Sequence, residues 1–149
     1  MKSIPLRRRQ SGFSLLEALL GILIFSVGIL ALVALQSISV KATTESKFRA
    51  DAGFLASQLV SEMWTDYTGA STGQYTINAN GNNCVFSGGP SSAKTARWIA
   101  AVKQALPGST DTSIQVITGA NNLISINICW TPPGADSTRQ FSTVTQINL

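Results

Sequence analysis

The sequence contains no histidine and only two cysteines among its 149 residues. Without histidine, neither a Cys/His nor a Ser/His catalytic pair can form. The usual Cys and His ligand sets of a zinc site cannot be filled either. Clustered carboxylates and a phosphate-binding glycine loop are also missing, which argues against a membrane-bound enzyme or sensor. We therefore expect no catalytic site, no metal site and no cofactor, and the chain is predicted not to be an enzyme.

A strongly charged domain is lacking as well. Of the eleven Lys and Arg residues, four precede Gly12, and the remaining seven are balanced by the seven Asp and Glu residues that follow. The formal net charge of +4 thus belongs to the first twelve residues. A neutral domain has no overall field that attracts phosphates, so we expect no nucleic-acid partner.

Charge is almost absent from Phe13 to Leu35, where Glu17 is the only ionisable residue. As a helix, this run would be about 34 Å long, enough to cross a hydrocarbon core of about 30 Å. It is longer than the apolar region of a secretory signal, which has about 7–15 residues. Three arginines at positions 7–9 precede it. The positive-inside rule then places residues 1–12 in the cytoplasm and the C-terminal part outside.

Glu17 lies one turn into this apolar run, within the sequence GFSLLE from Gly12 to Glu17. A carboxylate near the centre of a membrane helix costs about 2.5–3.5 kcal/mol, and somewhat less toward its end. Two readings are open at this point. The side chain either reaches the membrane interface or pairs with a positive group of a neighbouring subunit.

The order of basic leader, Gly12, Phe13, Glu17 and apolar run resembles the class III prepilin signal of type IV pilins. This resemblance implies that prepilin peptidase cuts between Gly12 and Phe13, removes residues 1–12 and methylates the new N-terminus. It also implies that Glu17 meets the N-terminal amine of an adjacent subunit in the filament. Opposite charges in a helix bundle of low dielectric offset each other's desolvation.

Residues 28–63 are similar to the minor pilins of the PilV type and, less closely, to the minor pseudopilins of type II secretion. Leu35 and Gln36 end the apolar run, and an Arg-x-x-Ala sequence follows at residues 49–52. The resemblance implies a structural subunit that assembles or initiates a type IV pilus. The alternatives are a pseudopilin and a subunit at the pilus tip that binds DNA or a host receptor.

The resemblance also implies partners and a location. The expected partners are prepilin peptidase, other major and minor pilins, the inner-membrane assembly platform and, before assembly, membrane lipid. The chain would first span the bacterial inner membrane once, with its C-terminus in the periplasm, and then enter an extracellular pilus.

The helix is predicted to continue beyond the membrane, because no proline occurs from Gln36 to Asp66. Apolar residues recur there at steps of three and four, which predicts one buried helix face. These residues are Phe48, Ala52, Leu55, Leu59 and Met63.

The remainder predicts a small α+β domain. Residues 68–92 have loop composition with a possible short strand at 75–77, and a helix capped by Ser91 or Ser92 is expected at 93–106. Strand-like runs are expected at 113–118, 123–130 and 140–148, and in the middle run isoleucines alternate with more polar residues. On this helix Ala96, Ile99, Val102 and Leu106 are expected to share a side, and the core or subunit interfaces are expected to hold Trp64, Trp98 and Trp130.

The expected fold is therefore a pilin-like one, in which a long N-terminal helix packs on a small antiparallel sheet. We divide the chain into a leader (1–12), a transmembrane part of the helix (13–35), an extracytoplasmic part (36–66) and a globular head (67–149).

Cys84 and Cys129 both fall on the side predicted to lie outside the cytoplasm, where disulfides form and persist. We expect them to be bonded, and the alternative is two unpaired cysteines. Closure of such a loop would stabilise the fold by about 4 kcal/mol in the chain-entropy model.

Overall fold

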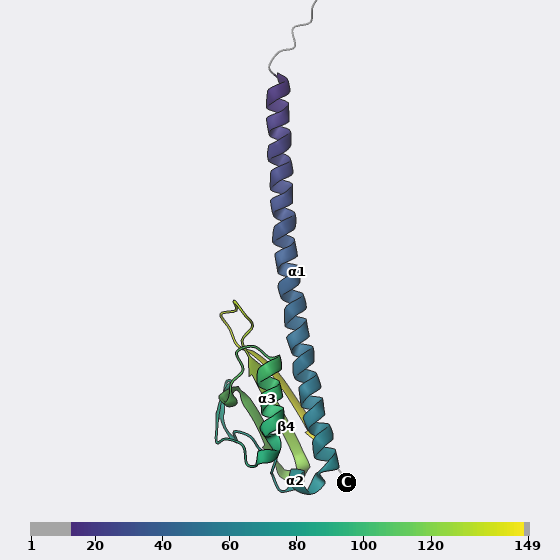
Figure 1. The fold of residues 1–149 in the computed structure, drawn as a ribbon, viewed down its shortest axis with the longest axis vertical. Coiled ribbons are helices and arrows are strands. Elements are labelled where there is room, and N and C mark those ends of the chain that lie inside the picture. Colours follow the sequence, from purple (N-terminus) through teal and green to yellow (C-terminus); the bar gives the residue numbers. More distant parts are fainter. Residues whose placement is uncertain (1–12, 148–149) are drawn as a thin grey trace, which may run out of the picture. The chain divides into compact units, whose positions relative to one another are not determined.

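The computed structural model describes residues 13–147, with side chains from Leu15 onward. The chain divides into two compact units, residues 1–43 and residues 44–149 (Figure 1). Helix α1, Phe13–Thr65, begins in the first unit and ends in the second. We call residues 44–149 the C-terminal unit. Its further elements are α2 (Tyr67–Ser71), β1 (Asn80–Asn82), β2 (Val85–Ser87), η1 (Ala93–Thr95), α3 (Ala96–Ala105), η2 (Asp111–Ser113), β3 (Ile114–Thr118), η3 (Ala120–Asn122), β4 (Leu123–Trp130) and β5 (Arg139–Gln146).

In the first unit, the described part of α1 carries apolar side chains on all sides. Every large apolar residue from Leu15 to Val40 is exposed, with Leu15 at 74% and Ile24 at 69%. The helix is long and apolar enough to cross a membrane. A surface of this kind is stable only in an apolar environment, which a bilayer or a bundle of like helices provides.

In the C-terminal unit, the second half of α1 buries the predicted stripe. Ala52, Leu59 and Met63 are fully buried and Leu55 nearly so, while Phe48 is half-buried. The indole Nε1 of Trp98 on α3 donates a hydrogen bond of 2.8 Å to the backbone carbonyl of Leu55. This contact joins the two helices above the sheet.

The sheet is antiparallel, in the order β3–β4–β5. Its central strand β4 pairs in continuous register with β5, from Leu123 opposite Gln146 to Trp130 opposite Arg139. Ile124, Ile126 and Ile128 alternate inward and join one core with residues of α1 and α3. The predicted α+β architecture, a long N-terminal helix with a small antiparallel sheet, is confirmed. The division into head and extracytoplasmic helix at residue 67 stays a prediction.

Three local expectations differ from the structure. The region expected to be loop contains α2 and the hairpin β1–β2. The expected strand at 75–77 is reduced to isolated bridges from Ile77 to Pro90 and Val116. Helix α3 buries Trp98 with Val102, whereas Ala96 is exposed, because the side that faces α1 is fixed by the Trp98 hydrogen bond.

Candidate functional site

The residues predicted to be processed lie at the start of α1. Gly12 lies outside the described residues. Phe13 is the first residue of the helix, where backbone N–H groups have no partner within the helix and the dipole is positive. Glu17 is exposed one turn later and is the only ionisable residue from Phe13 to Val40. A carboxylate is thus presented on an otherwise apolar helix surface.

The family model described as the prokaryotic N-terminal methylation motif matches residues 7–33. No curated protein matches the chain, and no solved structure does. The motif supports a class III signal of the type IV pilin-like kind. Such a signal implies processing by prepilin peptidase and assembly with other pilins. The matched stretch contains Gly12, Phe13 and Glu17, whose individual roles stay predictions.

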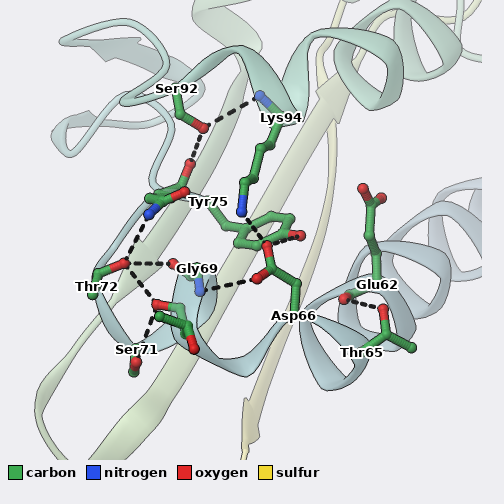
Figure 2. A network of polar contacts seen from close by, with 11 residues as sticks. Glu62, Thr65, Asp66, Gly69, Ser71, Thr72, Tyr75, Ser92 and Lys94 are labelled. Carbon is green, nitrogen blue, oxygen red and sulfur yellow. Dashed lines mark hydrogen bonds and ion pairs between the residues drawn. The ribbon is translucent and has the colours of Figure 1, made fainter.

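The C-terminal unit contains a polar network at the end of α1, which the sequence does not predict (Figure 2). Asp66 follows α1 and caps α2, because its Oδ1 accepts a hydrogen bond of 3.2 Å from the backbone N–H of Gly69. Its Oδ2 accepts from the hydroxyl of Tyr75, at 3.1 Å, and from the ammonium of Lys94. One carboxylate therefore ties the end of α1 to α2, to residue 75 and to η1.

Gly69 fits this network because it has no side chain. A β-carbon at this position would overlap the Asp66 carboxylate and crowd the Lys94 ammonium. The same ammonium lies 5.9 Å from the centre of the Tyr75 ring, within reach of a cation–π interaction.

The network shifts the pKa values of two members in opposite directions. The hydrogen bond from Lys94, with those from Gly69 and Tyr75, holds the pKa of Asp66 below its usual value. Burial, followed by the hydrogen bond to Asp66, raises the pKa of Tyr75 to about 12. Asp66 is thus ionised and Tyr75 protonated throughout the neutral range, which keeps the donor and the acceptor matched.

A pH series tests this network. The pKa of Asp66 is lower in the folded chain than in the unfolded one, so its contribution is present above about pH 4 and is lost as the pH falls further. Asp66→Asn keeps a capping side chain but removes the charge. We expect this variant to melt below the wild type at neutral pH, with the difference closing as the pH falls below about 4. The loop variant Asp136→Asn is the control. A difference in melting temperature between Asp66→Asn and the wild type that stays the same at every pH would contradict the assignment.

A second ion pair connects α1 to β5. Nε of Arg139 lies 2.9 Å from Oε1 of Glu45, although the angle is not that of a hydrogen bond. Arg49, one turn along α1, lies 4.0 Å from the same oxygen. Glu45 on α1 thus contacts the first residue of the last strand. This strand is 94 positions away by residue number, a distance over which sequence periodicity carries no information.

The predicted cysteine pair is bonded in the structure, with an S–S distance of 2.06 Å and a Cα–Cα distance of 5.7 Å. Cys84 lies in the tight turn between β1 and β2, and Cys129 is buried on β4. The disulfide fastens this hairpin to the sheet. Next to it, a ladder of side-chain amides crosses the strands: Asn127 donates to Gln115 at 3.0 Å, and Gln140 donates to Asn127 at 3.2 Å.

Within residues 13–147, no group of three or more His, Cys, Asp or Glu side chains is placed to hold a metal ion. The candidate functional features in this part of the chain are an exposed apolar surface and contacts that stabilise the C-terminal unit. They are the apolar helix with Glu17, and a small domain braced by the Asp66 network, the Glu45–Arg139 pair and the disulfide.

Proposed function

We propose that the chain is a minor pilin of the PilV type, a structural subunit and not an enzyme. It would be cut after Gly12 by prepilin peptidase, methylated on Phe13, and assembled with other pilins into a type IV pilus or its initiating complex. The observation that carries this proposal is the N-terminal methylation motif at residues 7–33, together with helix α1, which begins within the motif and exposes an apolar surface from Leu15 to Val40. The choice of the PilV type rests on the resemblance of residues 28–63 to those minor pilins.

The mechanism follows from the helix. While the subunit waits in the inner membrane, lipid covers the apolar side chains of residues 13–35. In a filament, neighbouring apolar helices replace the lipid, so the segment need not meet water. The C-terminal unit, outside the cytoplasm, then supplies the surface that contacts other subunits.

A clean deletion in the native host, scored for sheared surface pili and for secreted enzymes, tests the choice of machine. We expect lost or reduced pili with intact secretion, restored by the gene in trans. Normal pili with lost secretion would overturn the minor-pilin assignment and move the chain to the pseudopilins of type II secretion.

A further inference from the structure

The last strand, β5, forms an open edge of the sheet. It pairs with β4 on one side, and no other strand within residues 13–147 pairs with its opposite side. The other edge of the sheet differs, because Val116 of β3 exchanges two backbone hydrogen bonds of 2.9 Å with Ile77. The outer edge of β5, a strand of eight residues, therefore presents the unpaired backbone N–H and C=O groups of every second residue.

Beyond Arg139, this edge lacks proline, charged side chains and bulges, which commonly protect an edge against strand pairing. Natural edge strands are blunted by proline, by charged side chains, by bulges or by short length. From Gln140 to Gln146 the strand has neither proline nor charge, and its register with β4 is unbroken. The charge of Arg139, at its start, is directed to Glu45 on α1. An unprotected edge of this length is a template for another strand.

A groove of about 320 Å³ lies beside this edge, between β5 and α1. On the helix side, Gly53, Ser57 and Ser61 recur every fourth residue, and Trp64 ends the row with 44% of its surface exposed. The hydroxyls of both serines donate back to helix carbonyls, at 2.9 Å each, so their donor groups need no water. The wall on the strand side consists of Phe141, Thr143 and Thr145.

A single added strand could pair with the open edge of β5 and also fill the groove. A strand added to β5 would lie about 4.8 Å from it and turn every second side chain toward α1. Those side chains would enter the groove and cover Trp64, while the alternate ones would face outward with Ser142 and Val144. We propose that β5 receives an uncharged β-strand of a different filament subunit, with small or β-branched side chains on its inner face. This deepens the proposed function and rests on it.

A second copy of the chain fits the site less well. If two β5 strands paired antiparallel, residues 44–65 of the two copies would run in opposite directions. Each copy is anchored through its own N-terminal segment, so opposite helix directions do not suit two subunits anchored in the same way. In a parallel pair, the second copy would turn its Gln140, Ser142, Val144 and Gln146 toward the helix face of Gly53 and Ser57. Gln140 and Gln146 have large amide side chains, whereas the groove accommodates small side chains.

Photocrosslinking in the host tests the proposal on the full chain. The probe is p-benzoylphenylalanine in place of Val144, which is 58% exposed and lies on the strand face opposite the groove. We expect a crosslink to a strand segment of another pilus subunit, identified by mass spectrometry. Ser57→Arg would place a charge in the groove and should lower this product by about tenfold or more, which is the effect of about 1.4 kcal/mol. Gln58→Arg, which adds the same charge on the helix side facing α3, should leave the product unchanged.

Three outcomes would overturn the proposal: no product above the background of a probe placed at Gln58, a product with a second copy of this chain, or a product that Ser57→Arg leaves intact. Melting temperatures of the two arginine variants check that both are folded. Intact mass and sheared filaments are measured on the same cells. A chain that is processed and present in filaments but gives no strand crosslink refutes this inference alone, whereas an unprocessed chain refutes the proposed function.

Discussion

Glu17→Gln is expected to leave cleavage after Gly12 intact but to lower the amount of the chain in sheared filaments by roughly 100-fold or more. In the proposed assembly the carboxylate of Glu17 and the methylated amine of a neighbouring Phe13 are both transferred into an apolar helix bundle. Removing one member of such a pair leaves the other charge buried without compensation, which costs about 3–5 kcal/mol. Glutamine has nearly the same shape as glutamate, so the change isolates the charge.

The control for this experiment is Ser26→Ala, in the same apolar segment. The Ser26 hydroxyl donates to the carbonyl of Ile22 at 2.7 Å, within its own helix, so its removal leaves no charge or donor of a neighbour unpaired. Quantitative immunoblots of membranes and sheared filaments report both variants. Incorporation of Glu17→Gln at the wild-type level would favour the simpler reading, in which the acid only reaches the membrane interface.

Loss of the disulfide should have the largest effect on the stability of the C-terminal unit. Cys84 and Cys129 are separated by 45 positions. Cys84→Ser is expected to destabilise the unit by about 4 kcal/mol, or to lower its melting temperature by roughly 10–20 °C. Reduction of the wild type should produce a similar shift. The exposed neighbour variant Val85→Ser should melt close to the wild type.

The turn that carries Cys84 allows a finer test. Asn83 and Cys84 both have positive φ, at 51° and 65°, a conformation that side chains other than glycine adopt at a cost of about 1 kcal/mol. Cys84→Gly also breaks the disulfide but relieves this cost. It should therefore be more stable than Cys84→Ser by about 1 kcal/mol. Equal melting temperatures and gel mobilities for Cys84→Ser and the wild type would show that the bond does not brace the unit.

The elements that sequence reasoning located well are those with a strong period. The apolar steps from Phe48 to Met63 predict the buried face of α1, because an α-helix repeats every 3.6 residues. Alternation of isoleucine with polar residues predicts β4 from Leu123 to Trp130. The pairing of the two cysteines follows from the predicted compartment and from the lack of a third.

The elements that it missed depend on contacts between distant residues. Strands β1 and β2 have three residues each and no apolar alternation, and a disulfide and a left-handed turn position them. Lys94 lies 28 positions from Asp66, and no periodicity relates the two. The sequence places Trp64, Trp98 and Trp130 in the core or at subunit interfaces but does not separate the two cases. The structure buries Trp98 and Trp130 and leaves Trp64 half-exposed in the groove beside β5, because the exposure of each depends on its position relative to the sheet.

The central claim, that this chain is a processed pilin-like subunit, is tested most directly by its intact mass in a host with an active prepilin peptidase. The account predicts a species that begins at Phe13, lacks the twelve-residue leader and carries one methyl group on its N-terminus. The same species should disappear in a strain without the peptidase. A chain that keeps Met1–Gly12 when the peptidase is present and processes its other substrates would contradict the account.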